Sequence, residues 1–357
     1  MSSIYGEKVK ISIFGESHGE AIGAVIDGLE SGYFIDFDEI ASQMKRRAPG
    51  YNNLSTARKE PDEVEVLSGI KNGFTIGSPV VGIIRNKNVH SSDYADMCNV
   101  MRPGHSDYTL RMKYGDFTDL RGGGHLSGRL TAPMTFAGAV CRQILYKKGV
   151  KVIAHAYSIG DVCDDTFDSV DVNFELMDRL RNEFFPVISS KKKDKMKELI
   201  QSVKKDGDSI GGVIECAIVG VSAGIGDPVF GGVENKISSA MFAIPGLKGI
   251  EFGSGFLSSQ MRGSENNDEF IVKNRIVSTV SNHSGGILGG ISSGMPIIFR
   301  VAIKPTPSIA KLQKSVNLET LENTTIQVIG RHDPCIVPRA IPVVEALASI
   351  AILDMMR

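Results

Sequence analysis

The sequence predicts an α+β protein with helices in its interior. First, several short β-branched segments bounded by glycine follow one another without a helix between them, which favours antiparallel pairing over a doubly wound parallel sheet. Second, three segments have helical periodicity, and two of them are apolar enough to be buried. Third, no repeat, low-complexity tract or linker divides the chain, so we expect residues 1–357 to form one domain.

The three helices are predicted from their ends and their spacing. The first begins after Asp36, has Glu39 three residues later and ends in the basic turn 45–47 before a proline. The second spans about 131–148 and ends in two lysines and a glycine. The third begins at Pro338 or just after, where the missing amide donor matters least, and continues toward residue 350.

The predicted strands are the β-branched segments 10–14, 63–67, 80–84, 150–154, 212–221 and 296–303. Segment 173–205 has few glycines and a lysine-rich run at 191–195. A solvated helical face explains this run better than an anion-binding arm does. Segment 220–226 is glycine-rich but lacks the dinucleotide-binding spacing, so we expect a turn there.

Composition excludes several classes of protein. The 40 Lys and Arg residues against 41 Asp and Glu give a net charge of -1, which argues against nucleic acid or an anionic membrane as the main partner. The five cysteines are far apart, and no apolar run reaches the ~18 residues that a membrane span needs. The N-terminal segment alternates like a strand and lacks the apolar block of a signal peptide. We expect a reduced, soluble, cytoplasmic protein.

The first candidate for chemistry is Gly-Glu-Ser-His-Gly at 15–19, which contains Ser17 and His18. It matches the nucleophile elbow of α/β-hydrolases, but only 14 residues precede it, too few to supply an oxyanion-hole loop. A hydroxyl and an imidazole among glycines can bind an anionic oxygen or give it a proton. Taken alone, such a pair in a glycine turn is more often structural.

Two further histidines lie beside glycines. His105 follows Arg-Pro-Gly, and His125 follows Arg-Gly-Gly-Gly at 121–124. Consecutive glycines can present backbone N–H groups to a phosphate, although a bare run can also be a flexible loop. No Gly-Lys-Ser/Thr follows, so hydrolysis of a nucleoside triphosphate is not supported.

Arginines gather near the turn-rich segment 48–56. Arg46, Arg47 and Arg58 flank it, and in a nearly neutral protein they suggest bidentate recognition of a small, multiply anionic molecule. The alternative is a solvated helix end favoured by the helix dipole. No metal-binding spacing links the seven histidines, so we expect no zinc site.

These motifs together resemble the chorismate synthase family. The matching segments occur in the family's order and cover most of the chain: 14–19, 102–109, 113–127, 209–215, 226–230, 244–256, 263–268, 284–294, 304–309 and 330–346. The resemblance implies a β-α-β sandwich, with helices packed between two antiparallel sheets, assembled as a homotetramer.

The resemblance also implies a reaction. 5-Enolpyruvylshikimate 3-phosphate loses its phosphate and a C6 proton in an anti 1,4-elimination that gives chorismate for aromatic amino-acid biosynthesis. Reduced FMN is required although no net redox change occurs. A departing phosphate leaves positive charge on the ring, which an electron-rich flavin can stabilise, and negative charge on oxygens, which cationic donors can stabilise.

By resemblance, His18 protonates or hydrogen-bonds the leaving phosphate, with Ser17 beside it. His105 lies at the flavin and balances the charge of its reduced ring, and Asp333 lies near flavin N5 and helps to remove the C6 proton. The candidate clamps for phosphate or carboxylate are Arg47, Arg129 and Arg331, with Arg46 and Arg58 as weaker ones.

The FMN site maps by resemblance onto His125, Leu126, Ser127, Pro245, Gly246, Gly289, Lys304, Pro305, Thr306, Pro307 and Ser308, with Arg331 close by. The family usually has Arg-Ser-Ser where this chain has His125-Leu126-Ser127, Asn-Ala where it has Pro245-Gly246, and Lys-Pro-Thr-Ser-Ser where it has Lys-Pro-Thr-Pro-Ser. Our hypothesis is that His125 still donates to the FMN phosphate.

Two alternatives stay open at this point. One is a serine hydrolase built on Ser17, and the other is an inactive flavin- or phosphate-binding protein that kept the loops and lost the chemistry. A nucleic-acid-binding module is the poorest option, given the net charge. Some family members reduce their own flavin with NAD(P)H, and the sequence does not say whether this chain does.

Overall fold

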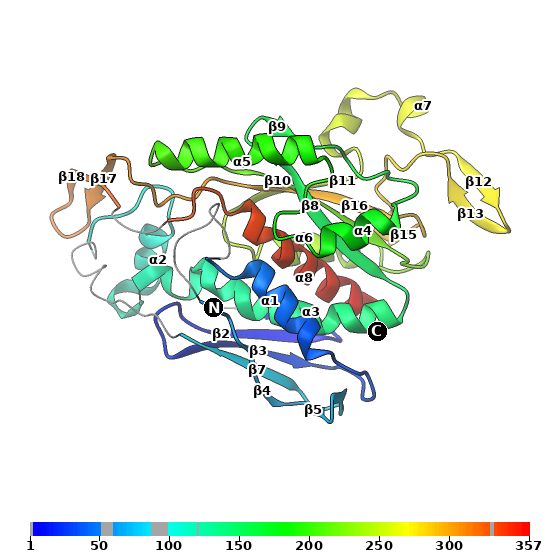
Figure 1. Ribbon diagram of the computed structural model, residues 1–357, viewed down its shortest axis with the longest axis horizontal. Helices are drawn as coiled ribbons and strands as arrows, with labels where there is room; N and C mark the ends of the chain where they lie inside the picture. The colour runs from blue at the N-terminus through cyan, green and yellow to red at the C-terminus, as the bar shows by residue number, and fades with distance from the viewer. Residues whose placement is uncertain (1–2, 51–59, 87–98, 120, 329–331) are drawn as a thin grey trace.

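The computed structural model describes residues 3–50, 60–86, 99–119, 121–328 and 332–357. Two five-stranded antiparallel sheets enclose a layer of helices (Figure 1). This arrangement confirms the predicted α+β class and the antiparallel pairing, and it has the helices between the sheets as the family resemblance implied.

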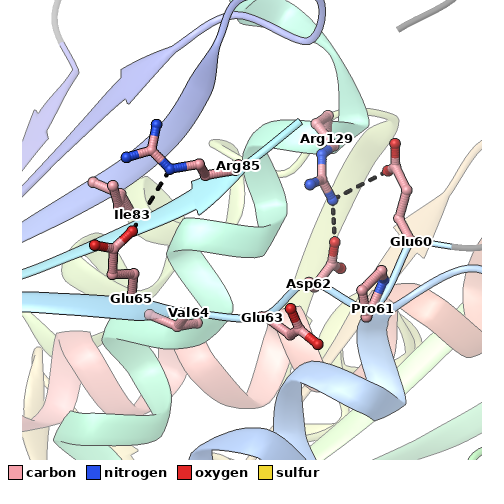
Figure 2. A pocket seen from close by; sticks show the side chains of 9 residues that line it. All are labelled: Glu60, Pro61, Asp62, Glu63, Val64, Glu65, Ile83, Arg85 and Arg129. Carbon is pink, nitrogen blue, oxygen red and sulfur yellow. Dashed lines mark hydrogen bonds and ion pairs between the residues drawn. The ribbon is translucent and has the colours of Figure 1, made fainter. Parts of the chain in front are cut away.

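The first sheet has the strand order β1-β2-β3-β7-β4. Its strands are β1 (Ile4–Tyr5), β2 (Lys10–Gly15), β3 (Ala21–Asp27), β4 (Glu65–Ser68) and β7 (Val80–Arg85). On one face Glu65 of β4 lies 3.6 Å from Arg85 of β7, as Figure 2 shows. The sequence predicted β2, β4 and β7. It missed β3, whose glycine and alanines weaken the β-branched pattern.

The second sheet has the strand order β11-β16-β10-β8-β9. Its strands are β8 (Lys151–Ile159), β9 (Val162–Cys163), β10 (Gly212–Val219), β11 (Leu247–Phe252) and β16 (Ile297–Ile303). Predicted segments 150–154, 212–221 and 296–303 correspond to β8, β10 and β16. The strand β11 was not predicted.

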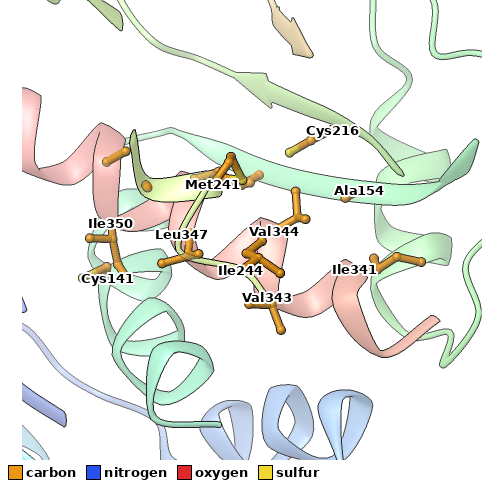
Figure 3. Packing of buried hydrophobic residues seen from close by; sticks show 14 of the residues in the cluster. Cys141, Ala154, Cys216, Met241, Ile244, Ile341, Val343, Val344, Leu347 and Ile350 are labelled. Carbon is orange, nitrogen blue, oxygen red and sulfur yellow. The ribbon is translucent and has the colours of Figure 1, made fainter. Parts of the chain in front are cut away.

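The helical layer is formed by α1 (Phe37–Arg47), α3 (Thr131–Lys147), α6 (Val233–Met241) and α8 (Val337–Met355). The Asp36 side chain caps α1 by accepting from the amide of Asp38 at 2.9 Å, as the sequence predicted. The helices α3 and α8 cross where a Cβ on Gly138 would collide with Ala346, so glycine permits the close approach. Figure 3 shows the apolar side chains of α8 packed with those of α3, α6 and the second sheet.

Segment 173–205 forms two helices outside the sheets, α4 (Phe174–Arg181) and α5 (Ser190–Lys205). Their apolar faces are buried, and most of the lysines of α5 are exposed or half-buried, which agrees with the predicted solvated face. Beneath α4, the side chains of Ile153, Ala217 and Ile298 form a small second core on the outer face of the second sheet.

The remaining elements are short. They are the helices α2 (Asp107–Tyr114) and α7 (Gly263–Asn266), the hairpins β5–β6 (Ile70–Lys71, Phe74–Thr75), β12–β13 (Phe270–Lys273, Ile276–Thr279), β14–β15 (Ile287–Leu288, Ile291–Ser292) and β17–β18 (Gln313–Asn317, Glu322–Ile326), and the 3-10 turns Gly115–Phe117, Arg121–Leu126, Gly128–Leu130, Val229–Gly231 and Gly255–Gln260. The glycine-rich segment 220–226 lies outside helices and strands, as predicted.

Candidate active site

Ser17 and His18 lie on the turn that follows β2. Ser17 is buried, and its hydroxyl donates to the carbonyl oxygen of Arg121 at 3.0 Å. Because that bond uses the hydroxyl proton, the same oxygen accepts from Nδ1 of His18, which lies 3.1 Å away. The imidazole is thereby fixed at Nδ1, and His18 does not take the serine proton. This arrangement argues against the serine-hydrolase alternative, which needs a base that accepts from Ser17.

The glycine turn 122–124 is the element that brings the two candidate histidines together. All three residues have positive φ, between 54° and 89°. A Cβ on Gly122 would lie 2.7 Å from Nδ1 of His18, and a Cβ on Gly123 would lie 3.2 Å from Cε1 of His105. The backbone amide of Ser17 also donates to the carbonyl of Gly124 at 3.2 Å. Glycine is therefore needed here both for its conformation and for the close approach of two imidazoles.

His105 lies in the turn before α2 and is held by two charged neighbours. Its Nδ1 lies 2.6 Å from a carboxylate oxygen of Asp107, and that carboxylate accepts from Nε and Nη2 of Arg102, each at 2.7 Å. Burial acts to raise the pKa of Asp107, but the hydrogen bonds from Arg102 and His105 outweigh burial and hold this pKa below its usual value. Asp107 is therefore a stable anion beneath the imidazole.

The loop 304–308, with Lys304, Pro305, Thr306, Pro307 and Ser308, follows β16 and lies against the His105 turn. The ammonium of Lys304 donates to the carbonyl of Gly104, and the backbone amide of Lys304 donates to the carbonyl of Gly246 at 2.9 Å. Residues Pro245 and Gly246 thus adjoin the same loop. Burial and then the charge of Lys248 lower the pKa of Lys304, so two cations are close together at this loop.

Arg47 and Arg129 share the buried carboxylate of Asp62. Nη1 of Arg47 donates to Asp62 at 2.6 Å, and Nη1 of Arg129 donates to the other oxygen of the same carboxylate. Figure 2 shows Arg129 between Asp62 and Glu60, whose carboxylate lies 3.3 Å away, at a cavity of about 400 Å³. The remaining donors of Arg47 bind Thr131 and the carbonyl of Gly128, so Arg129 is the better placed of the two for a ligand in the cavity.

The structure does not support substrate binding by Arg46. Its guanidinium is buried among the helices and binds the carboxylate of Glu345 at 2.5 Å and 3.1 Å, Gln43, and the carbonyl of Glu183. Glu345 also accepts from Arg142 and from the amide of Ala154. The two arginines at the basic end of α1 therefore bind different partners: Arg46 binds Glu345 among the helices, and Arg47 binds Asp62.

Both ring nitrogens of His125 form hydrogen bonds within the protein. Its Nδ1 lies 2.7 Å from the carbonyl oxygen of Gly15, and its Nε2 lies 2.9 Å from the hydroxyl of Ser3. A carbonyl cannot donate, so Nδ1 carries the proton and Nε2 accepts from Ser3. Both ring nitrogens are then occupied, which counts against donation to an FMN phosphate. Leu126 is exposed, and Ser127 caps the turn 128–130 by accepting from the amide of Arg129 at 3.3 Å.

Within one chain, Gly289 lies away from the other residues predicted for the FMN site. It lies in the β14–β15 hairpin before β16 begins, whereas Lys304 follows the last residue of β16. Seven residues of strand span roughly 20 Å. The hairpin instead adjoins the first turn of α6, where the amide of Val233 donates to the carbonyl of Gly290 at 2.9 Å.

Asp333 lies just before α8 and pairs with Arg339 of that helix. The Nε of Arg339 also donates to the backbone carbonyl of Arg47 at 3.0 Å, which ties Asp333 to the end of α1. Next to Asp333, the Nε2 atom of His332 is buried and has no hydrogen-bond partner in the described part of the chain. Burial and the nearby charge of Arg102 lower the pKa of His332. The predicted residues Arg58 and Arg331 lie outside the described residues.

Sequence reasoning missed several residues that hold this site. They are Asp62, Arg102, Asp107, Lys248 and Arg339. Arg102 and Asp107 stood in the motif quoted for His105, and their spacing around it was an available signal. Asp62 and Arg339 carried no such signal, because their contacts join segments far apart in the sequence.

The described part of the chain contains no group of three or more His, Cys, Asp and Glu side chains that could hold a metal ion. A search of the same residues finds no helix with the length and apolar character needed to cross a membrane. The site as a whole combines two fixed imidazoles, a buried arginine pair and a lysine loop. This set can bind and protonate an anion.

Comparisons with known proteins point to one family. The family model of chorismate synthase matches residues 9–357. A chorismate synthase of Dehalococcoides mccartyi (strain BAV1) is 45% identical over 355 residues, which cover 99% of this chain and 96% of the relative. One of Korarchaeum cryptofilum is 44% identical over 352 residues, and one of Methanococcus vannielii is 43% identical over 364 residues, with 98% and 100% of this chain and 96% of each relative covered.

A solved crystal structure of chorismate synthase has the same fold. Its TM-score is 0.77 at 28% sequence identity, and the match covers 98% of this chain and 92% of the solved one. Because the family model, the relatives and the fold all match over nearly the whole length, the chain belongs to the chorismate synthase family.

Proposed function

We propose that the residues around the glycine turn 122–124 carry out the reaction of the chorismate synthase family in this chain. The reaction is a carbon–oxygen lyase step of the shikimate pathway, in which 5-enolpyruvylshikimate 3-phosphate gives chorismate for aromatic amino-acid biosynthesis. The observation that carries the assignment to these residues is that one turn contacts both His18 and His105. Turnover of this substrate would rule out the alternative of an inactive binding protein.

The proposed role of His18 is to protonate or hydrogen-bond the departing phosphate. Its Nδ1 is bound by Ser17, whose hydroxyl is in turn bound by the carbonyl of Arg121. Nε2 is then the ring atom that exchanges a proton with the ligand. Ser17 acts by fixing the imidazole, and not as a nucleophile.

The proposed clamp for the anionic groups of the substrate is Arg129, supported by Arg47. Asp62 is shared by both guanidinium groups, and together with Glu60 it balances their charge when no ligand is bound, so an anionic ligand must displace Glu60 from Arg129. A dianionic phosphate next to this pair gains charge-assisted hydrogen bonds. Glu60 lies on the same cavity and competes for Arg129 when no anion is present.

The residues present fit reduced FMN, which the family requires. Lys304 and Lys248 supply positive charge for its phosphate, and the buried Oγ1 of Thr306 and Nε2 of His332 have no hydrogen-bond partner among the residues that the structure describes. Buried polar atoms normally have a partner, so these two atoms suit a bound polar group. Reduced flavin supplies electron density that stabilises positive charge on the substrate ring. We propose that Asp333, held by Arg339, lies beside it and assists removal of the C6 proton.

We also propose that the chain assembles as a homotetramer in the cytoplasm. Large apolar side chains of the projecting β12–β13 hairpin are solvent-exposed in the single chain: Phe270, Val272, Ile276 and Val277 are each more than 60% exposed. Figure 1 shows this hairpin extending from the body of the molecule. Exposed apolar patches of this kind mark protein interfaces.

The test is chorismate formation from 5-enolpyruvylshikimate 3-phosphate under anaerobic conditions with chemically reduced FMN. We expect product only with reduced flavin, and a loss of at least ~100-fold in kcat for His18→Ala, since general acid catalysis contributes about 10²–10⁴-fold. His283→Ala is the matched control, because His283 bonds the carbonyl of Asn266 at the end of α7, which lies far from α2 in Figure 1. No product at saturating reduced FMN would overturn the proposal.

A further inference from the structure

The contacts of His105 define which ring nitrogen carries its proton. Nδ1 lies 2.6 Å from an oxygen of Asp107 and 3.2 Å from Nη2 of Arg102. A carboxylate anion has no proton to give, so a bond of 2.6 Å requires the proton on Nδ1. Nη2 of Arg102 already donates to the same carboxylate oxygen at 2.7 Å, and its contact with Nδ1 follows from that bond.

The carboxylate of Asp107 is itself fixed. One oxygen accepts from Nε of Arg102 at 2.7 Å and from the backbone amide of Arg102 at 3.3 Å, and the other accepts from Nη2 and from His105. Asp107 is only 5% exposed and stands at the first position of α2, where the helix dipole favours an anion. The anion therefore has one orientation relative to the imidazole.

The opposite edge of the ring faces the glycine turn. A Cβ on Gly123 would lie 3.2 Å from Cε1 and 3.5 Å from Nε2 of His105, and the next glycine toward the N-terminus contacts His18. Other ionisable groups around the His105 turn are Lys304, on the carbonyl of Gly104, and His332, whose pKa is lowered by Arg102. Asp107 is the anion in contact with the ring.

We propose that Asp107 is a positioning residue for the reaction, which holds the proton of neutral His105 on Nδ1 and so presents Nε2 to the ligand at the glycine turn. The unprotonated Nε2 then accepts a hydrogen bond from the ligand, and the Asp107 anion stabilises positive charge that develops on the ring. The same logic explains carboxylate–histidine pairs in general: the carboxylate selects the tautomer and orientation. This inference rests on the catalytic site proposed above.

The first test is the tautomer of His105, read from the ¹⁵N chemical shifts of its ring nitrogens by NMR in the full-length protein. We expect a protonated Nδ1 and an unprotonated Nε2 at a pH where the ring is neutral. Free histidine prefers the other tautomer, so a protonated Nε2 in the unmodified protein would overturn the proposal without any variant.

The second test is Asp107→Asn. The amide oxygen of this asparagine is expected to replace the carboxylate oxygen that accepts from Nε and the backbone amide of Arg102. The amide NH₂ then faces His105. Nδ1 must then accept, and the proton moves to Nε2. We expect an inverted tautomer, a kcat lowered at least ~100-fold and a KM changed less than about threefold. Asp194→Asn, on the exposed face of α5, is the matched control with the same atoms exchanged.

The outcomes separate the two proposals. An Asp107→Asn protein that keeps the tautomer of the unmodified protein would overturn the positioning role. An inverted tautomer with unchanged kcat would support the role of Asp107 in holding the ring and overturn the catalytic role of His105. An inverted tautomer with lowered kcat supports both.

Discussion

At the scale of single residues, the site depends on charges that are buried in contact with each other. Burial acts to raise the pKa of Asp62, but Arg47 and Arg129 outweigh it and hold this pKa below its usual value. Burial also lowers the pKa of Arg47 to about 10, although Asp62 opposes this shift. Each buried ion is therefore stabilised by a partner of opposite charge.

Asp62→Asn should therefore destabilise the protein by about 3–5 kcal/mol, because it removes the buried carboxylate that Arg47 and Arg129 share and leaves Arg129 with Glu60. The free energy of unfolding in urea, followed by circular dichroism, measures the change. Asp194→Asn on the surface should change it by less than ~0.5 kcal/mol. Equal stabilities of the two variants would show that Asp62 does not neutralise the pair.

The cofactor loop gives a second prediction at this scale. Lys304→Ala should weaken FMN binding at least ~10-fold, whereas His125→Ala should leave it within about threefold, because both nitrogens of His125 are bonded to the protein. Fluorescence titration of oxidised FMN measures both dissociation constants. A strong loss in His125→Ala alone would restore our hypothesis that this ring donates to the FMN phosphate.

At the scale of elements, the turn 122–124 differs from what the sequence suggested. Three glycines between arginines indicated a loop that presents amides to a phosphate, and the structure adds that the turn contacts two imidazoles from distant segments. The helices α1, α3 and α8 were predictable because caps and apolar spacing are local signals. The strands β3 and β11 and the inward direction of Arg46 were not, because they depend on partners that are distant in the sequence.

Gly122→Ala should lower kcat at least ~10-fold with little loss of stability beyond about 1–2 kcal/mol, since a Cβ there displaces His18 and a left-handed alanine is strained. Gly149→Ala is the control, because Gly149 also has positive φ and no atom lies within 4 Å of its Cβ position. Steady-state kinetics and thermal melting separate the two effects. Equal kcat values in the two variants would contradict contact between the turn and His18.

At the scale of the whole molecule, one helical layer serves both sheets. α8 contacts α1, α3, α6 and the second sheet, and α3 contacts the first sheet. Glu345 of α8 joins Arg46 of α1, Arg142 of α3 and the backbone of β8 in one buried network. We infer that residues 1–357 form one domain, because a single cluster of buried apolar side chains extends from the first sheet through the helical layer to the second sheet.

A second buried network, on the outer face of the second sheet, gives a prediction about pH. His155 bonds Asp164 and Glu215, and Glu215 bonds Arg300. Burial acts to lower the pKa of His155, but the two carboxylates outweigh it and raise this pKa. Its stabilising contribution is complete below the unfolded value of about 6.5 and is lost as pH rises through the folded value. Burial acts to raise the pKa of Asp164 and of Glu215, but the hydrogen bonds from His155 outweigh burial and hold both pKa values below their usual range. The stabilising contribution of these two carboxylates is lost in acid.

Between pH 6.5 and 9 the free energy of unfolding should therefore fall more steeply in the unmodified protein than in a His155→Gln variant. Urea unfolding at half-unit pH steps measures both slopes. Parallel slopes would mean that His155 is not charged in the folded protein.

The position of α8 also has a consequence for how the protein is made. The ribosome synthesises every strand of both sheets before it synthesises the helix that packs between them. Until α8 has emerged, the nascent chain exposes the inner, apolar faces of its strands and the facing side of α3. Chaperone capture during translation is the expected fate of such a chain, and the sandwich closes only afterwards.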